Sequence, residues 1–357
     1  MKSSRAVVGT YVGRFFLVFF TLVLAILVNL LAMVYMFCKG PSKSARDLFT
    51  TTMLETGQLK FVASIFLSQE EIMEAVAENS MEAMNEEMNT DMIQITQVNS
   101  DVTQMAETTT APITIEEISG RTFFAKMMIV QDPSKVSVGT TYPWGAYGRE
   151  LGTIVEEQGA IAGVNGGLYQ SAGNTGGLPM GIVVSNGEIQ YNSCSGVTGL
   201  YLVGFNEDDI LLIKNIGGMS NAEVETLVKQ ERVRDAVVFQ EESSDANNHF
   251  VPLLINGEAR QVDGMGSGAN PRTAIGQKAD GTVLLLVTDG RGVSGHLGAT
   301  ASDLIQIMQE YGAVNAANID GGSSSSMYYN GNYEMTSVTF YFSNSSWKLP
   351  TTFVVKE

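Results

Sequence analysis

Cysteine and histidine are scarce in this chain of 357 residues, which has two of each. Cys38 follows directly on a long apolar run and Cys194 lies far along the chain, so we expect no disulfide between them and no disulfide-rich scaffold. His249 and His296 are too few for a histidine-based zinc site. We interpret His296, in "VSGHLGAT", as a loop residue rather than a catalyst.

Positive charge is also scarce. The chain has 21 Lys and Arg residues against 38 Asp and Glu residues, a formal net charge of −17. A nucleic-acid-binding surface needs a basic face for the phosphate backbone, so we expect no nucleic-acid partner. The sequence also lacks a Walker motif and a G-x-S-x-G motif. The glycines of "GMGSGA" at residues 264–269 precede a predicted strand rather than a helix, so they do not form a dinucleotide motif.

One apolar run is long enough to cross a membrane. Residues 15–37, "FFLVFFTLVLAILVNLLAMVYMF", are interrupted only by Thr21 and Asn29, and a bilayer core of about 30 Å needs about 20 such residues. The run exceeds the apolar part of a secretory signal and no small-residue cleavage site follows it. We therefore predict an uncleaved transmembrane anchor, with a cleaved signal peptide as the alternative.

Orientation cannot be taken from the basic residues, because they are nearly balanced on the two sides of this run. A long acidic folded part after a single N-terminal helix is typical of a protein whose bulk lies outside. We predict a single-pass protein of the cell membrane, with residues 1–14 as a cytoplasmic tail and an extracytoplasmic C-terminal part.

Residues 38–119 are predicted to form a helical acidic stalk and a linker. From residue 44 to about residue 90 the apolar spacing is helical, and Ser68 and Glu71 fit a capping box. No Lys or Arg occurs between Phe61 and Gly120, as is typical of a solvated acidic segment. A methionine-rich stripe on these helices is expected to pack against a neighbouring helix, with a partner or dimer contact as the alternative. The threonine-rich residues 89–114 are interpreted as a linker.

Residues 120–357 are predicted to form one mixed α/β domain. Short apolar runs separated by Gly, Asn and Asp indicate strands, and helical spacing appears at residues 221–232 and 300–311. "SNGE" at residues 185–188 and "KADGT" at residues 278–282 are hairpin signals. Residues 283–287 are apolar at every position, which suits a strand covered on both faces. We expect a central mixed β-sheet with flanking helices.

Three segments share one form, an apolar strand that ends in Asn or Asp followed by glycine. They are "AGVNGGLY" at residues 162–169, "LLVTDGRG" at residues 285–292 and "NAANIDGGSSSS" at residues 315–326. A single Asx-Gly pair is usually a tight turn. Three of them, each after a buried strand, favour a binding site, because loops at strand ends bring side chains together.

Charged residues at these strand ends could carry chemistry. Arg272 precedes an apolar strand, where a guanidinium could hold a phosphate or carboxylate or could form a structural ion pair with a site aspartate. Asp289 and Asp320 are the carboxylates available for acid–base work or metal binding, and the sequence leaves open whether a divalent metal is used; no cofactor is identified. A phosphate leaving group is already acidic, so its departure needs cations or N–H groups more than a general acid.

At these residues the chain resembles the phosphodiester glycosidase family, whose bacterial members are often described as exopolysaccharide biosynthesis proteins. Similarity runs from about residue 125 to the C-terminus, and four motifs stand in the family's order. They are Asn165, Gly166 and Gly167; Pro271, Arg272 and Thr273; Asp289, Gly290 and Arg291; and Asn318, Asp320, Gly321, Gly322 and Ser323.

The resemblance implies a hydrolase that cleaves a sugar-1-phosphodiester, acting in cell-surface polysaccharide metabolism on a phosphodiester-linked glycan or cell-surface polysaccharide. It implies that Asp289 and Asp320 act as acid–base or nucleophilic carboxylates, that Arg272 and Arg291 hold the phosphate and that Asn165 orients the substrate. Gly166, Gly167, Gly321, Gly322, Ser323 and Ser324 would bind substrate or phosphate, the last four through a nest of N–H groups.

Two segments depart from the family pattern. Residues 240–257, "QEESSDANNHFVPLLING", are lengthened, and Trp347 and Lys348 stand where relatives often carry an arginine before Leu-Pro, so substrate contacts are expected to differ. A glycan-binding or assembly factor without turnover, and a transferase of glycan phosphate to an acceptor other than water, are the alternative functions.

Overall fold

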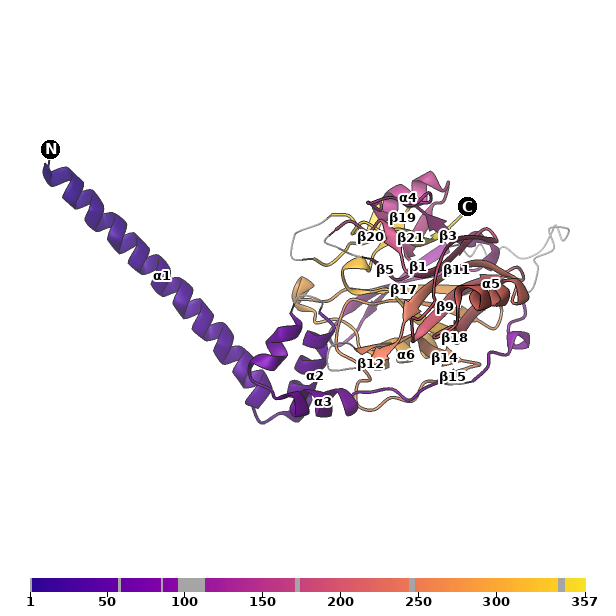
Figure 1. Cartoon of the computed structure of the whole chain (residues 1–357), viewed down its shortest axis with the longest axis horizontal. Coiled ribbons are helices and arrows are strands. Elements are labelled where there is room, and N and C mark those ends of the chain that lie inside the picture. Colours follow the sequence, from indigo (N-terminus) through magenta and orange to yellow (C-terminus); the bar gives the residue numbers. More distant parts are fainter. Residues whose placement is uncertain are drawn as a thin grey trace.

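The computed structural model describes residues 2–56, 59–84, 86–95, 113–170, 174–243, 248–339 and 344–357. A helical N-terminal part is followed by a sheet-rich domain (Figure 1). The predicted fold class, helices and sheets in one domain behind an N-terminal apolar helix, is confirmed. Most of the predicted linker, residues 96–112, and four residues of the lengthened loop, 244–247, lie outside the described residues.

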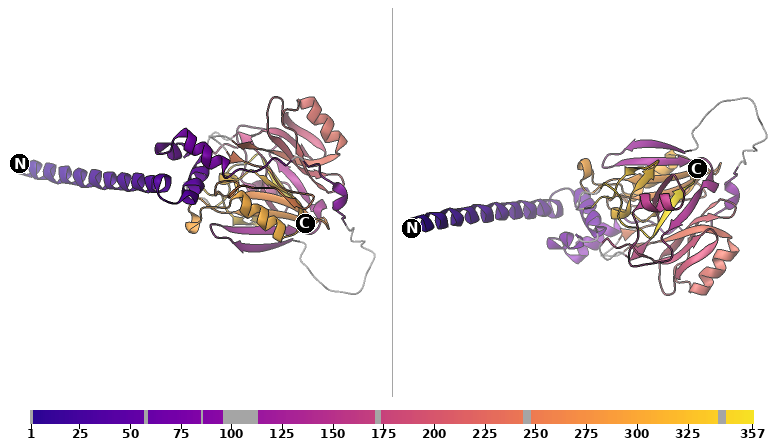
Figure 2. Two further views of the ribbon diagram at one scale, coloured as in Figure 1. Left: turned by 90° about the horizontal axis from the view of Figure 1, so that it is seen from below. Right: turned by 90° about the horizontal axis from the view of Figure 1, so that it is seen from above.

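Helix α1 (Lys2–Lys39) contains the predicted anchor. Its segment Tyr11–Lys39 is long and apolar enough to cross a membrane, and the helix projects away from the rest of the molecule (Figure 2). The hydroxyl of Thr21 and the amide of Asn29 donate hydrogen bonds to the carbonyls of Leu17 and Ala25, four residues earlier. These polar groups are therefore satisfied within the helix, as a hydrocarbon environment requires.

Three short helices pack at the C-terminal end of α1: α2 (Lys43–Leu54), the 3₁₀ helix η1 (Lys60–Ile65) and α3 (Gln69–Ala77). The capping box of Ser68 and Glu71 is present. Ile72 and Val76 of α3 are buried with Cys38 and Leu54 in one apolar cluster. The last turn of the anchor helix is thus built into a folded unit instead of ending in a free chain.

The chain then runs along the sheet domain through the 3₁₀ helix η2 (Thr90–Met92). Met81 forms a β-bridge with Val262, the Asn89 N–H donates to the side chain of Asn256, and the Gln94 N–H donates to the Ala279 carbonyl. The described part of residues 38–119 therefore contacts the domain rather than standing free of it as a solvated stalk.

The largest sheet has seven strands, and its neighbouring strands are antiparallel. In sheet order they are β1 (Ile113–Ser119), β2 (Phe124–Val130), β17 (Val283–Thr288), β16 (Thr273–Lys278), β18 (Ala313–Ile319), β14 (Pro252–Ile255) and β15 (Glu258–Ala259). Helix α6 (Ala301–Glu310), capped by the side chain of Thr300, packs against β14 and β18. The sheet thus begins before residue 120, the expected domain boundary.

Two five-stranded and two two-stranded antiparallel sheets accompany it, so the described strands form several antiparallel sheets rather than one central mixed sheet. The second sheet contains β10 (Leu211–Asn215), β9 (Leu200–Asn206), β11 (Val233–Gln240), β7 (Gly181–Ser185) and β8 (Glu188–Ser193), and the third contains β20 (Asn332–Met335), β19 (Met327–Tyr329), β4 (Ala162–Asn165), β21 (Thr351–Val355) and β3 (Val136–Thr140). Shorter elements are η3 (Pro133–Lys135), α4 (Leu151–Glu157), β5 (Tyr169–Gln170), β6 (Leu178–Pro179), α5 (Asn221–Gln230), β12 (Glu242–Ser243), β13 (Asn248–His249), η4 (Val293–Gly295) and η5 (Gly322–Ser324).

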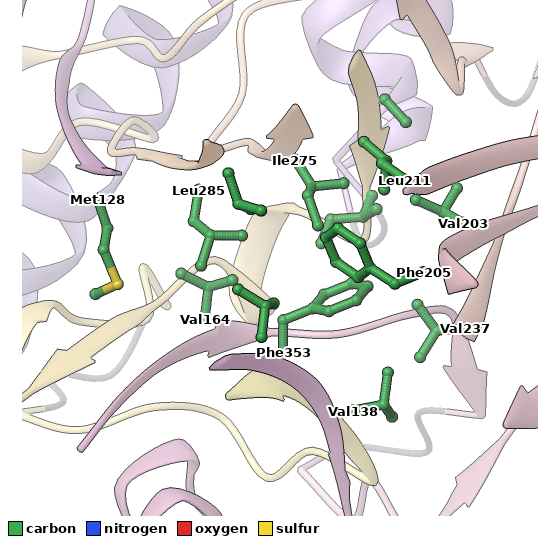
Figure 3. Packing of buried hydrophobic residues seen from close by; sticks show 14 of the residues in the cluster. Met128, Val138, Val164, Val203, Phe205, Leu211, Val237, Ile275, Leu285 and Phe353 are labelled. Atoms are coloured by element: carbon green, nitrogen blue, oxygen red, sulfur yellow. The ribbon is translucent and has the colours of Figure 1, made fainter. Parts of the chain in front are cut away.

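The three sheets share one apolar core (Figure 3). Leu285 of the first sheet, Phe205 of the second and Phe353 of the third are fully buried in it, and the rings of Phe205 and Phe353 meet edge to face. Leu284 and Leu286 point to the other face of the first sheet, into a second cluster with α6. This two-sided burial explains why residues 283–287 are apolar at every position.

Both predicted hairpins are present. Asn186 and Gly187 have φ values of 51° and 76° between β7 and β8, the left-handed geometry of a two-residue type I′ turn. The second hairpin joins β16 to β17, where Gly281 has a φ of 94° and the Lys278 N–H donates to the Thr282 carbonyl.

Candidate active site

Three of the predicted charged residues lie at one edge of the seven-stranded sheet. In the register, Thr273 at the start of β16 pairs with Val287 near the end of β17 and with Ile319 at the end of β18. Arg272, Asp289 and Asp320 therefore leave the sheet at the same edge. Asp289 and Asp320 are two strands apart, which places their backbones about 10 Å from each other at the usual strand spacing.

Asp320 occupies a half-buried turn directly after β18. Its carboxylate is hydrogen-bonded to the side chain of Ser324 and the N–H of Gly321, and Arg291 is a nearby positive charge. Burial outweighs these three contacts and raises the pKa of Asp320 to about 7. Near neutral pH this carboxyl group is thus close to half-ionised, which suits a group that exchanges protons during a reaction.

Tyr169 extends the hydrogen-bond network of Asp320. Its hydroxyl lies 2.9 Å from the Ser324 hydroxyl, and burial, followed by the Asp320 charge, raises the pKa of Tyr169 above its usual range. Tyr169 is 8% exposed. It therefore acts as a neutral phenol that fixes the Ser324 side chain against Asp320.

Arg291 reaches from the loop after β17 across to the turn after β18. Its guanidinium donates a 2.9 Å hydrogen bond to the Ser323 hydroxyl, and a Cβ added to Gly322 would lie 2.7 Å from one of its nitrogens. Gly322, with a φ of 62°, leaves room for this side chain. Since Arg291 is an exposed residue beside Asp320, its charge is available to an anionic ligand.

The backbone N–H groups of the turn mostly have partners within the protein. Gly321 donates to the Asp320 carboxylate, Gly322 to the Pro271 carbonyl and Ser324 to the Gly321 carbonyl. These bonds shape the turn instead of presenting the expected row of N–H donors. We infer that the Ser323 hydroxyl of this turn, together with Arg291 from the loop after β17, is best placed to meet a phosphate.

Asn165 is fully buried at the end of β4. Its amide donates a 2.6 Å bond to the Asp320 carbonyl, and its oxygen accepts bonds from the Thr273 hydroxyl and the Ser326 N–H. The side chain thus joins β4, β16 and the turn after β18. It holds Asp320 in place and is shielded from solvent.

Gly166 and Gly167 permit close packing. The Gly166 N–H donates to the Thr351 carbonyl and the Gly167 N–H to the Thr351 hydroxyl. An added Cβ would lie 2.6 Å from Thr351 at the first position and 2.6 Å from the Val238 carbonyl at the second. Both glycines are needed because neighbouring strands leave no space for a side chain.

Arg272 is 6% exposed and is held on several sides. Its guanidinium pairs with Glu55, which lies at the end of α2, and donates to the Gly268 and Ala299 carbonyls and the Ser267 hydroxyl. It also lies 4.9 Å from the ring centroid of Phe250. The partner in this ion pair is a residue of the N-terminal helices rather than a site aspartate.

Asp289 forms a pair with His296. Its Oδ2 atom lies 2.6 Å from Nδ1 of the histidine, and its Oδ1 accepts a 2.8 Å bond from the Phe124 N–H at the start of β2. Asp289 is 7% exposed. Both oxygens of the Asp289 carboxylate are thus held by hydrogen bonds. The contact with His296 joins Asp289 to the far end of the loop that carries Arg291.

The sequence reasoning missed three residues of this region. Tyr169 ends the segment 162–169, where no local signal distinguishes it, and His296, expected to be only a loop residue, contacts Asp289. Glu55 is 217 positions from Arg272, and no local pattern predicts this contact. Among the described residues, no three His, Cys, Asp or Glu side chains gather as a metal site would require.

Comparisons with known proteins agree with this architecture. The phosphodiester glycosidase family matches residues 158–356, more than half of the chain, and the chain belongs to that family. The catalytic domain of zebrafish N-acetylglucosamine-1-phosphodiester alpha-N-acetylglucosaminidase, auto-inhibited by its pro-peptide, has a similar fold. The TM-score is 0.52 at 19% identity, covering 69% of this chain and 82% of that one.

A curated relative is the SPbeta prophage-derived uncharacterized protein YomE of Bacillus subtilis (strain 168). It is 25% identical over 233 residues, which cover 61% of this chain. The match covers 33% of the relative, so this chain spans about a third of the length of that protein.

Proposed function

We propose that the protein is a membrane-anchored hydrolase that cleaves a sugar-1-phosphodiester in cell-surface polysaccharide metabolism, with its sheet domain outside the cell. The observation that carries the proposal is the position of Asp320, whose pKa is raised to about 7, near the positive charge of Arg291, which reaches the same turn from the loop after β17 and bonds Ser323 there. A carboxyl group and a cation are the two elements that water activation and phosphate departure require.

In the proposed mechanism Arg291 binds the phosphate, which leaves as an anion and needs little protonation. The demanding step is then the attack of water on the sugar carbon. Ionised Asp320 accepts the proton of that water, while Ser324 and the Gly321 N–H hold its carboxylate in position. Asn165 and Arg272 stabilise the surrounding loops, and Asp289 fixes the loop of Arg291.

The first substrate to test is an N-acetylglucosamine-1-phosphodiester, the substrate class in the name of the zebrafish protein. Purified full-length protein in detergent should release the sugar, and Asp320→Asn should abolish release while the melting temperature changes little. Turnover by Asp320→Asn at the wild-type rate would overturn the role of Asp320. Glycan binding without turnover on a panel of sugar-1-phosphodiesters would favour a binding or assembly factor, and products formed only with an added acceptor would indicate a transferase.

Cell fractionation tests whether helix α1 anchors the chain in a membrane. Helix α1 should keep the whole chain in the membrane fraction after a carbonate wash, because its exposed apolar length matches a bilayer core. Protease added to intact cells should then degrade the C-terminal domain. Full protection of that domain in intact cells would indicate that it lies inside the cell and would contradict the proposed orientation.

A further inference from the structure

A hollow lies at the two-stranded sheet of β5 and β6, one residue along the chain from Tyr169 of the candidate site. It has a volume of about 120 Å³ and is lined by Gly145, Ala146, Gln170, Thr175, Gly177 and Leu178. Gln170 directly follows Tyr169, whose hydroxyl bonds Ser324 beside Asp320. The short strand β5 therefore leads from the candidate site to this hollow.

Two chain segments, 145–149 and 174–178, carry five of the six lining residues and form the wall of the hollow, and segment 347–349 is hydrogen-bonded to both. The Gly148 N–H donates to the Thr175 carbonyl, the Arg149 N–H donates to the Leu349 carbonyl, and the Lys348 N–H donates to the Asn174 side chain. The backbones approach so closely that a Cβ on Gly177 would lie 2.2 Å from the Gly145 carbonyl. The wall is thus a fixed structure rather than a loose loop surface.

An aromatic ring and a cation stand beside this wall. Tyr147 is 66% exposed, and Nζ of Lys348 lies 5.1 Å from its ring centroid. Leu178 in the wall is 38% exposed. No ion pair among the described residues includes Lys348, so its charge faces the ring and solvent instead of a carboxylate.

We propose that Tyr147, Lys348 and Gln170 form an additional subsite for a glycan that continues beyond the scissile phosphodiester and carries a second anionic group. The apolar C–H face of a sugar ring packs on an exposed aromatic ring, and a few polar groups fix its orientation. Gln170 bonds the sugar hydroxyls, and Lys348 receives the second phosphate or a carboxylate. This inference rests on the proposed function and defines its substrate class as a polymeric anionic glycan.

Kinetics with two substrates test the subsite. Tyr147→Ala and Lys348→Gln should raise KM about tenfold for an oligomer of at least two phosphodiester-linked sugar units, the loss expected for one aromatic or cationic contact. KM for a monomeric sugar-1-phosphodiester should stay within about twofold, since it does not reach the subsite. Lys348→Arg should retain most of the preference for the oligomer, and Lys356→Gln, which removes an exposed lysine near the chain end, serves as the charge-matched control. Equal losses with both substrates would overturn the proposal.

Binding measurements separate failure of the subsite from failure of the proposed function. The Asp320→Asn protein, titrated calorimetrically with the same oligomer, should bind it about tenfold more tightly than Asp320→Asn with Tyr147→Ala. Equal affinity, or no binding by Asp320→Asn, overturns the subsite even if the wild type hydrolyses the monomer. Absence of turnover by the wild type on either substrate, with the affinity difference intact, overturns the hydrolase and leaves the subsite standing.

Discussion

Glu55 and Arg272 form a buried ion pair between helix α2 and the edge of the seven-stranded sheet. The side chain of Glu55 is 2% exposed and that of Arg272 is 7% exposed. Glu55 also accepts bonds from the Gly268 N–H and the Asn270 amide. The N-terminal helices are thereby fastened to the loop from which Arg272 enters β16.

Glu55→Ala should lower the free energy of unfolding by about 3–5 kcal/mol, because the buried guanidinium of Arg272 would lose its counter-charge. Urea denaturation of the full chain in detergent measures this loss. Glu157→Ala is the control, since its pair with Arg149 is half-exposed and such surface pairs contribute about 0–1 kcal/mol. Equal losses of unfolding free energy in the two variants would contradict the stabilising role of the Glu55–Arg272 ion pair.

The pH dependence of the rate follows from Asp320. If its ionised form accepts the proton of water, kcat/KM should rise with pH through about 7, the value to which burial raises its pKa. A pH–rate profile over about two pH units on either side of this value measures the rise. A rate that falls through this range would make Asp320 a general acid instead.

The free energy of unfolding should fall as the pH rises, whereas the rate should increase. The folded protein keeps the Asp320 proton up to about pH 7, whereas the unfolded chain releases it near the ordinary value of 3.8. Because the folded state binds more protons between these values, its stability should fall as the pH rises through the window. Asp320→Asn should reduce this slope in melting curves recorded at a series of pH values, and an unchanged slope would assign the titration to other groups.

His296→Ala tests the pair with Asp289. His296 and Arg291 belong to one loop, in which the Arg291 N–H donates to the Leu297 carbonyl and the Gly292 N–H to the His296 carbonyl. Without the contact to Asp289 this loop should hold Arg291 less firmly, which should raise KM about tenfold and change kcat little. Leu297→Ala, at an exposed position of the same loop, is the control. A large fall in kcat at constant KM would instead indicate that His296 acts on the reacting groups.

Gly167→Ala should destabilise the protein by about 1–3 kcal/mol through overpacking. The added Cβ would lie 2.6 Å from the Val238 carbonyl and 2.7 Å from Cβ of Val237. Gly145→Ala is the control, because its added Cβ meets no atom within 4 Å. Equal melting temperatures for Gly167→Ala and the wild type would refute the packing role of Gly167.

Local patterns predicted much of the fold. The Asn186–Gly187 turn, the capping box of Ser68 and Glu71, and the two-sided burial of residues 283–287 each depend on neighbours in sequence. The antiparallel arrangement into several sheets was not predicted, because strand pairing joins segments far apart, such as β2 with β17. Sheet partners leave no periodic signal within a single strand.

The candidate site, like the fold, was predicted only in part from the sequence. Asp320, Asp289 and Arg272 were found because each stands at a strand end, where the sequence changes abruptly from apolar to polar. Two partners that decide their roles were not found, since Glu55 lies 217 positions from Arg272 and Tyr169 reaches the Asp320 network through Ser324, 155 positions away. Asn165 was selected from its motif, but its buried contact with the Asp320 carbonyl was not predicted. Chemistry can be assigned from residue type and position, but whether a side chain faces ligand or protein depends on packing.

The compact junction between α1 and the sheet domain sets the distance between the end of α1 and the candidate site. The last turn of α1 packs on α2 and α3, and α2 is joined through Glu55 to Arg272 beside the candidate site. With α1 in a bilayer, Asp320 stands at a set height above the lipid surface, because folded protein rather than a slack tether spans the interval. Under the proposed function, the site would reach only substrates that lie at this distance from the membrane.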